Sequence, residues 1–189
     1  MNAEHHSISL AEAGLRDTLI LMACGGKKAE TAGQPVPLVE LYQGPMWSTL
    51  RKRLGGAEQL RRSGAHVVVL SGGLGVIPAL WLAAPYEVRL TRERADALMA
   101  VGIQGKDWRG TTVLSSLFPR DRDPAARPWR AVIAAGGSDY RRVFLRWAEE
   151  LRSMHYLCAD APVYATTGGI GEQRSQLGQW IDQLVGKDA

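Results

Sequence analysis

The sequence predicts an α/β fold with three layers, in which a mostly parallel central sheet lies between two layers of helices. Short apolar segments of strand length alternate along the chain with longer segments whose apolar residues recur at helical spacing, an alternation typical of this class. The clearest apolar segments are followed by glycine, as expected of buried parallel strands that end at loops. Together these observations indicate strands covered by helices on both faces.

Four segments are predicted to be strands because each is apolar, has the length of a strand and precedes a glycine-containing loop. They span residues 18–23, 66–70, 131–135 and 162–165, and a weaker fifth candidate covers residues 112–114. Helices are predicted at residues 45–54 continuing through 58–63, 92–101, 138–154 and 172–184. Trp147 and Trp180 lie on the apolar stripes of the last two helices, so we expect them to be core residues and not platforms for stacked bases.

One domain is expected from the size of the chain. With 189 residues, of which 46% are hydrophobic, the chain is large enough to bury one core and falls within the usual range of a single domain. We expect that domain to span residues 18–189, preceded by a flexible N-terminal arm of residues 1–17. Residues 118–129 carry three prolines and no periodic pattern, so they are predicted to form a surface loop.

Cysteine count and hydropathy indicate a cytoplasmic protein. The two cysteines, Cys24 and Cys158, are too few for a disulfide framework, and no cysteine–histidine spacing resembles a zinc site. The first 17 residues lack the features of a signal peptide, and no apolar segment reaches the roughly 18 residues that a membrane span needs. We therefore expect no metal, no cofactor and no membrane partner.

The charge balance permits an anionic partner such as DNA. Lysine and arginine outnumber aspartate and glutamate by 23 to 19, which gives a formal net charge of +4 and allows a polyanion without requiring one. Each basic cluster is expected either to contact phosphates or to be the solvated face of a helix or a charged loop. The clusters are Arg51, Lys52, Arg53, Arg61 and Arg62; Arg120, Arg122, Arg127 and Arg130; and Arg141, Arg142 and Arg146.

Four polar, glycine-containing loops follow the predicted strands, at residues 24–28, 71–75, 136–140 and 166–172. Because the carboxyl ends of parallel strands share one edge of a sheet, the loops are predicted to meet there. Paired glycines and helix N-termini at such an edge favour an anionic ligand. No loop matches the phosphate-binding pattern G-x-x-x-x-G-K-[ST] or the dinucleotide fingerprint, which argues against nucleoside-triphosphatase and NAD-dependent activities.

The polar groups of these loops fit nucleotide recognition. Lysines can hold phosphate, hydroxyl groups can bond to a sugar or base, and tyrosine rings can stack on a base. Cys24 has two interpretations. It could be a nucleophile beside two lysines, but a thiol that ends a buried strand is more often a small core residue. The residues predicted to bind substrate are Cys24, Gly25, Gly26, Lys27, Lys28, Tyr42, Ser71, Gly72, Gly73, Tyr86, Ser138, Tyr140, Thr167, Gly169 and Gly171.

Three carboxylates near the loops are the candidate catalytic residues: Glu87, Asp139 and Glu172. Each also has a structural interpretation as a helix N-cap or as a first-turn acid that the helix dipole stabilises. No histidine is placed for Ser-His-Asp chemistry, because none of the four lies in these loops. The sequence leaves open which carboxylate would act.

The order of several short motifs resembles an uncharacterised bacterial and phage family. Its members open with a strand, a C-G-x-x-K loop and a downstream L-Y motif, matched here at residues 24–28 and 41–42. An L-S-x-x-x-G-L segment and a P-Y-D motif follow, matched at residues 70–74 with one spacing change and at residues 85–87 with Glu87 in place of aspartate. A G-x-x-Y motif at 137–140 and a closing G-x-G at 169–171 complete a match that covers roughly residues 18–184.

That family is similar to the peroxide-stress YaaA proteins and to domains attached to archaeosine-making enzymes, and more distantly to the uracil-DNA glycosylase fold. The resemblance implies a uracil-DNA-glycosylase-like fold and a partner that is a nucleic acid or a modified base. The hypothesis that follows is a DNA glycosylase-type enzyme that hydrolyses the N-glycosidic bond of a modified or damaged base, in base excision or in defence against phages with altered bases.

In this hypothesis Glu87 or Asp139 orients a water molecule, Lys27 or Ser71 receives charge on the departing base, and Tyr86 or Tyr140 stacks on it. Two alternatives stay open. One is an enzyme that acts on free nucleotides, as a hydrolase or deoxyribosyltransferase. The other is a nucleic-acid-binding protein without chemistry, in which the carboxylates are helix caps and the glycines only form turns.

Overall fold

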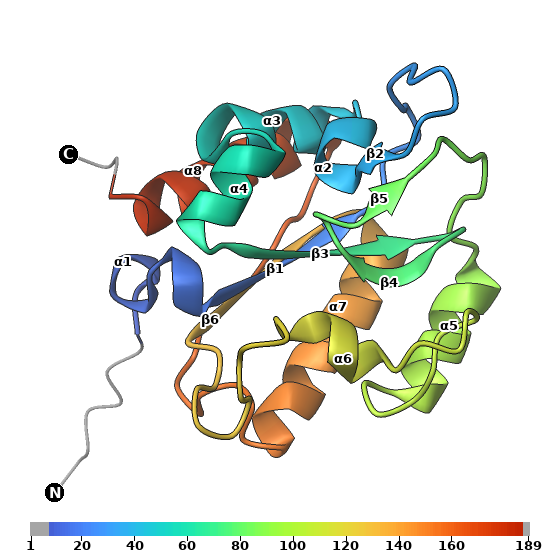
Figure 1. The fold of residues 1–189 in the computed structure, drawn as a ribbon. Coiled ribbons are helices and arrows are strands. Elements are labelled where there is room, and N and C mark those ends of the chain that lie inside the picture. Colours follow the sequence, from blue (N-terminus) through green and yellow to red (C-terminus); the bar gives the residue numbers. More distant parts are fainter. Residues whose placement is uncertain (1–7, 187–189) are drawn as a thin grey trace, which may run out of the picture.

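A five-stranded sheet forms the centre of the structure, a computed structural model that describes residues 8–186 (Figure 1). The strands follow the order β4-β3-β1-β6-β7. Strands β3, β1, β6 and β7 are parallel, and β4 runs antiparallel to β3. Their bounds are β1 (Thr18–Ala23), β3 (His66–Ser71), β4 (Gly75–Pro78), β6 (Ala131–Ala135) and β7 (Val163–Ala165).

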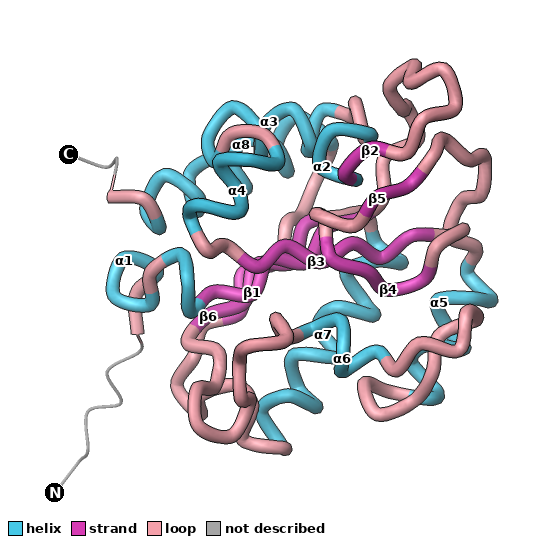
Figure 2. The backbone as a smooth tube through the Cα atoms, in the orientation of Figure 1, coloured by secondary structure: helices cyan, strands magenta, loops and turns pink. Residues whose placement is uncertain are grey.

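Helices cover both faces of this sheet, which confirms the predicted three-layer α/β arrangement (Figures 1 and 2). Within residues 8–186, no helix is long and apolar enough to cross a membrane. One layer contains α1 (Leu10–Ala13), α2 (Leu38–Leu41), α3 (Pro45–Leu54), α4 (Ala57–Ser63) and α8 (Ile170–Leu184). The other contains α5 (Arg92–Val101), α6 (Val113–Leu117) and α7 (Ser138–Ser153).

Alternate residues of the central strand β1 face the two layers. Leu21 packs with the apolar residues of α5, α6 and α7, and it lies in register between Val68 of β3 and Ala134 of β6. Ile20 and Met22 point to the opposite face and pack with α3 and α8. Since the side chains of a strand alternate between its faces, a strand that is apolar throughout has to be buried on both sides.

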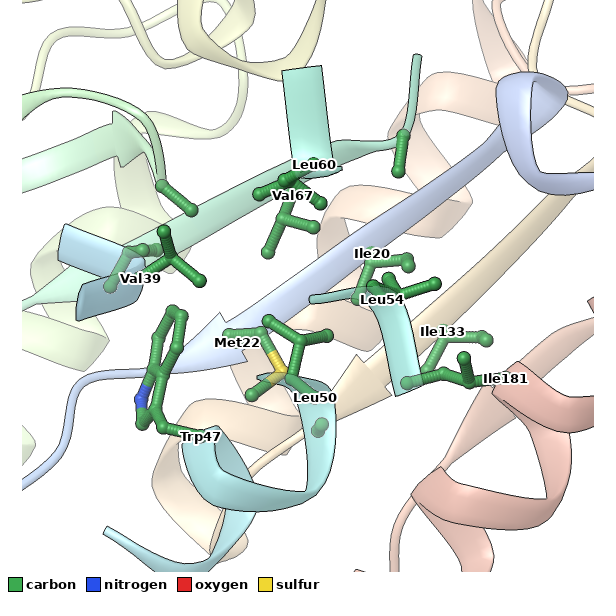
Figure 3. Close-up of a cluster of buried hydrophobic side chains, with 14 of the residues drawn as sticks. Ile20, Met22, Val39, Trp47, Leu50, Leu54, Leu60, Val67, Ile133 and Ile181 are labelled. Carbon is green, nitrogen blue, oxygen red and sulfur yellow. The ribbon is translucent and has the colours of Figure 1, made fainter. Parts of the chain in front are cut away.

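Figure 3 shows the core on the face that α3 and α8 cover. Trp47, Leu50 and Leu54 lie on one side of α3 and are buried over Met22 and Ile20 of β1. Each such side chain contributes roughly 1.5–3 kcal/mol through burial of apolar surface. This packing fixes α3 against β1, and with it the loop that leads from β1 towards α3.

All four predicted strands are present, with ends within one residue of the predicted ones. The prediction of a strand at 112–114 was wrong, because Thr112 is the N-cap of α6 and Val113 begins that helix. Strand β4 was not predicted, nor was the small antiparallel sheet of β2 (Val36–Pro37) and β5 (Leu82–Ala83). Segments of two to four residues show too little alternation to distinguish a strand from a loop.

The segment predicted as one helix with a continuation, residues 45–63, forms two helices. Gly55 ends α3 with a φ of +81°, a conformation that favours glycine. The Glu40 carboxylate then accepts a hydrogen bond of 2.7 Å from the backbone N–H of Ala57, at the start of α4. A side chain from α2 therefore caps the second helix.

Residues 8–17, part of the expected N-terminal arm, fold onto the domain. Ser9 caps α1 by a reciprocal capping box with Glu12. Leu10 is buried in the same apolar cluster as α8, and a 3₁₀ turn over Leu15–Asp17 leads into β1. Residues 1–7, the rest of that arm, lie outside the described residues.

The loop of residues 118–129 is held in place by Arg122. Its guanidinium donates hydrogen bonds of 2.9–3.0 Å to the carbonyls of Arg16, Arg127 and Pro128 and to the Asp17 carboxylate. Its charge also lies 3.7 Å from the centre of the Trp129 ring. Burial opposes ionisation of Asp17, but hydrogen bonds from Arg127 and Arg122 outweigh it and lower the pKa of that carboxyl group. The prediction of a loop is confirmed, and Arg122 ties this loop to residues 16 and 17.

His66, at the start of β3, should make stability depend on pH. Burial lowers the pKa of this imidazole from 6.5 to about 4, although its hydrogen bond to Ser116 partly opposes the shift. As pH falls from about 6.5 to 4, the unfolded chain binds a proton that the folded chain does not, so about 3 kcal/mol of stability is lost across this window. Urea unfolding at several pH values measures the loss.

A His66→Gln variant is the control for this effect, because it keeps an N–H donor for the Ser116 carbonyl but does not titrate. The difference in unfolding free energy between wild type and variant should change between pH 6.5 and 4 and stay constant above pH 7. Parallel profiles for the two proteins would contradict the role given to His66.

Candidate functional site at the carboxyl edge of the sheet

The topology of the sheet selects one place for a ligand. The connection from β1 to β3 runs through α3 and α4 on one face, and the connection from β6 to β7 runs through α7 on the other face. The two neighbouring strands β1 and β6 therefore feed helices on opposite sides of the sheet. In open parallel sheets, ligands bind outside the carboxyl ends of the strands at such a switch point.

The four predicted loops meet at this edge, as the sequence indicated. Each loop begins at the carboxyl end of a parallel strand: β1, β3, β6 or β7. The loops after β6 and β7 are joined by a hydrogen bond of 3.1 Å from the backbone N–H of Gly136 to Thr166 Oγ1. Arg141 Nη1 adds a bond of 2.9 Å to the Thr166 carbonyl. Figure 2 shows the irregular segments that gather on this side of the sheet.

Five hydroxyl and thiol side chains lie close together at the switch point in two hydrogen-bonded sets, and we call them the hydroxyl cluster: Cys24, Tyr42, Ser71, Tyr86 and Tyr140. Cys24 Sγ lies 3.0 Å from Tyr140 Oη, and this contact joins the loops after β1 and β6. Tyr86 Oη forms short hydrogen bonds with both Tyr42 Oη and Ser71 Oγ. The structure thus brings together five of the residues predicted to bind substrate.

Two members of the hydroxyl cluster are fully buried, and three are half-buried. Tyr42 and Ser71 have no exposed surface, so both act through Tyr86, and Tyr42 has no free ring face for stacking on a base. Trp47, which the sequence did not single out for the site, covers Tyr42 at 5.0 Å between ring centroids. Its Nε1 donates to the Ala23 carbonyl at 3.0 Å. The helical spacing of Trp47, Leu50 and Leu54 marks Trp47 as buried but gives no sign of the contact with Tyr42.

The segment of residues 84–91, which has no regular secondary structure, carries Tyr86 into this cluster. It passes so close to the loop after β3 that only glycine fits there. A Cβ atom at Gly72 would lie 2.1 Å from the backbone carbonyl carbon of Arg89, and one at Gly73 would lie 2.7 Å from the Tyr86 ring. The Arg94 guanidinium also donates to the Gly72 carbonyl. Gly72 therefore allows two backbone segments to pack closely, and Gly73 makes room for the Tyr86 side chain.

The three phenols of the hydroxyl cluster are neutral at physiological pH. Burial is the main cause that raises the pKa values of Tyr42, Tyr86 and Tyr140, and neighbouring groups, including the Cys24 thiol, add to it. Each phenol therefore keeps its proton and can both donate and accept a hydrogen bond. Lys28 Nζ lies 4.7 Å from the centre of the Tyr86 ring.

A cavity of about 710 Å³ lies beside this cluster. One wall is the loop of residues 28–33, and the other is formed by Pro85 and Glu87, on either side of Tyr86. Glu87 is exposed and is the one predicted catalytic carboxylate among the residues that line this cavity. Lys28 lines the same cavity, so an acid and a base face one hollow next to the Tyr86 ring.

The other two predicted carboxylates lie at helix N-termini. Asp139 is in the first turn of α7, about half exposed, and its nearest cation is Arg142 at 4.0 Å. Glu172 is in the first turn of α8, where it accepts a bond of 3.4 Å from Gln176. Both positions fit the structural interpretation, in which a first-turn acid is stabilised by the helix dipole.

The remaining predicted residues lie at the same edge, and of these Gly25 packs against the hydroxyl cluster. Gly25 approaches the Tyr42 side chain so closely that a Cβ atom there would lie 3.3 Å from Tyr42 Cβ. The backbone N–H of Thr167 donates to Gln176 at 2.8 Å. The others are exposed to solvent: Gly26, Lys27, Ser138, Gly169 and Gly171.

Most arginines of the basic clusters have partners within the protein. Arg51 donates to the carbonyls of Val39 and Tyr42 at 2.5–2.6 Å. Ion pairs of 2.7–3.2 Å hold Arg53 to Asp182, Arg142 to Asp96 and Arg146 to Glu150. Near the carboxyl edge, Lys27 and Arg89 are exposed and have no side-chain hydrogen bond or ion pair to any residue between 8 and 186. The cationic surface at this edge is smaller than the sequence suggested.

A comparison with family models, with curated proteins and with solved structures finds no significant match to this chain. In the part of the chain that the structure describes, no group of three or more histidine, cysteine, aspartate or glutamate side chains is placed to hold a metal ion. The site brings together the hydroxyl groups and the thiol of the hydroxyl cluster, and the neighbouring cavity adds Lys28, Glu30 and Glu87.

Proposed function

We propose that the carboxyl edge binds a nucleobase and that the protein hydrolyses the N-glycosidic bond of a modified or damaged base in DNA. The hydroxyl cluster is the observation that carries this proposal. A nucleobase is flat and neutral, with hydrogen-bond donors and acceptors on its edge. The neutral phenols of the half-buried Tyr86 and Tyr140 both donate and accept hydrogen bonds, which suits that edge, and the Tyr86 ring suits the flat face.

Hydrolysis needs two further functions, and the neighbouring cavity supplies groups for both. Water attacks C1′ of the sugar while the bond between C1′ and the base nitrogen breaks. The Glu87 carboxylate orients that water, offsets positive charge on the sugar and accepts its proton. The base leaves with the bonding electron pair, and Lys28 stabilises and protonates it. Both side chains line the same cavity beside Tyr86.

Two features support the nucleic-acid context. The doubly wound parallel sheet with its crevice at a switch point is compatible with the uracil-DNA-glycosylase-like fold that the motifs suggest. Lys27 and Arg89 are exposed at the same edge and available for phosphate groups. An enzyme of this type would extrude the target nucleotide from the duplex before cleavage.

A second candidate, an enzyme for free nucleosides or nucleotides, is favoured by one observation. Arg51, Arg53 and Arg141 of the basic clusters are engaged in internal hydrogen bonds, which leaves a small cationic surface for a DNA backbone. A single nucleotide needs one phosphate contact, which Lys27 or Arg89 is able to supply. The same hydroxyl cluster would serve this substrate.

The test incubates the purified protein with phage DNA carrying unmodified, hydroxymethylated or glucosylated bases, and with the matching deoxynucleotides, and identifies released bases by mass spectrometry. Release from DNA supports the proposal, and Glu87→Gln should lower the rate about 10²- to 10⁴-fold. Asp139→Asn is the matched control and should retain the wild-type rate.

Other outcomes overturn the proposal in defined ways. Release from deoxynucleotides alone would assign the second candidate. If no base is released but the protein binds DNA, with a log–log salt slope of about −0.9 per phosphate contacted, the protein is a binding module without chemistry. Equal rates in wild type and Glu87→Gln would exclude Glu87 as the catalytic carboxylate.

A further inference from the structure

A second cavity, of about 540 Å³, lies at the opposite edge of the sheet. We call it the amino-edge cavity because His66, one of its lining residues, begins β3, and Arg16 lies just before β1. The turn between α4 and β3 forms one wall, and the loop of residues 119–127 forms another. In Figure 1 this edge lies where β1 and β3 begin, away from the carboxyl edge.

The side chains around this cavity carry an excess of positive charge. The lining includes four arginines and two aspartates: Arg16, Arg61, Arg122 and Arg127, and Asp121 and Asp123. A third aspartate, Asp17, neutralises part of this charge through bonds of 3.0 and 2.8 Å to Arg122 and Arg127. Burial is the main cause that lowers the pKa of Arg122; the hydrogen bond and charge of Asp17 oppose this shift, and the like charge of Arg127 adds to it. Guanidinium groups are thus held close together against their mutual repulsion.

Two of these arginines are free to receive a ligand. Among residues 8–186, the Arg16 guanidinium has no hydrogen bond or ion pair, although its backbone carbonyl accepts from Arg122. Arg61 has a single ion pair to Glu58, at 3.8 Å and exposed to solvent. Both border the turn at Gly64: Arg16 Nε lies 3.1 Å from the position of a Cβ atom there, and the Gly64 N–H donates to the Arg61 carbonyl.

The deeper wall of the cavity is neutral and largely apolar. Leu60, Ala65 and Leu80 line it together with His66. Because a carbonyl only accepts hydrogen bonds, the contact of 3.0 Å between His66 Nε2 and the Ser116 carbonyl places a proton on Nε2. A ligand in this cavity therefore meets cations at the mouth and apolar surface inside.

We propose that the amino-edge cavity binds a small organophosphate, with the phosphate group between Arg16 and Arg61 and the organic group against Leu60, Ala65 and Leu80. Guanidinium groups match phosphate oxygens in charge and geometry. The apolar wall gives an organic phosphate an advantage over inorganic phosphate. This site is separate from the carboxyl edge and does not depend on the function proposed there.

Phenyl phosphate is a suitable probe because it joins a phosphate to an apolar group and contains no nucleobase for the carboxyl edge to bind. Its affinity for the full chain is measured by isothermal titration calorimetry, with inorganic phosphate and phenol as the two halves. Phenyl phosphate should bind more tightly than either half. Arg61→Ala and Arg16→Ala should each weaken binding at least about tenfold, since each removes a charge-assisted contact.

Arg62→Ala is the matched control, because Arg62 lies next to Arg61 on α4, pairs with Glu58 at 2.9 Å and does not line the cavity. The affinity of Arg62→Ala for phenyl phosphate should equal that of the wild type. An equal loss in Arg62→Ala and Arg61→Ala would point to diffuse surface charge and overturn the proposal. No binding of phenyl phosphate to the wild type would also overturn it.

Discussion

Replacing Arg122 with alanine should lower the free energy of unfolding by about 3 kcal/mol or more. The side chain is 5% exposed and bonds to three backbone carbonyls and to Asp17. Alanine would leave those carbonyls without their donor and remove the cation from the face of Trp129. Asp17 would keep Arg127 as a partner, at 2.8 Å, so part of the ion pairing survives.

Urea unfolding of three variants measures the effect. Arg120→Ala is the control, since Arg120 lies two residues away in the same loop, is exposed, and should change stability by less than about 0.5 kcal/mol. Arg122→Lys should recover little of the lost stability. The lysine ammonium group is a compact charge and cannot reach the several acceptors that the planar guanidinium group reaches. An exposed ion pair contributes roughly 0–1 kcal/mol. If the free energy of unfolding of Arg122→Ala differs from that of the wild type by no more than about 1 kcal/mol, the loop is held by other contacts.

Gly72→Ala should damage both the fold and the site. Its Cβ atom would lie 2.1 Å from the carbonyl carbon of Arg89 and 2.4 Å from the backbone nitrogen of Leu90. Backbone atoms do not rotate away as the end of a flexible side chain does, so the segment of residues 84–91 has to move and Tyr86 with it. We expect a loss of about 1–3 kcal/mol in stability from overpacking.

The displacement of Tyr86 gives this variant a spectroscopic signature. Burial raises the pKa of Tyr86 in the wild type, so a variant that exposes its ring should ionise this phenol at lower pH, which ultraviolet absorbance during an alkaline titration detects. Base release, if the protein catalyses it, should fall in parallel. Gly26→Ala is the control, because a Cβ atom at Gly26 would have no neighbour within 4 Å. Identical titrations in Gly72→Ala and wild type would contradict the proposed close approach.

The strands and the place of the candidate site follow from local sequence. Residues 18–23 and 131–135 are apolar except for Thr18 and end at glycine-containing loops, and both are buried strands of a parallel sheet. Because parallel strands align their carboxyl ends, finding the strands also locates the edge where Cys24, Ser71 and Tyr140 meet. The burial of a strand and the geometry of the turn that follows it depend on a few neighbouring residues. A short stretch of sequence is therefore enough to predict both.

Tertiary structure alone decided which side chains meet and whether the arginines bond inside the protein or face solvent. Tyr86 bonds with Tyr42 and Ser71 because a segment without periodicity crosses the edge of the sheet, and no local pattern encodes that path. Arg51 and Arg122 belong to basic clusters of the sequence, yet both bond to backbone carbonyls inside the protein. A long side chain takes whichever acceptor the fold places within reach, and that choice depends on contacts between residues distant in the sequence.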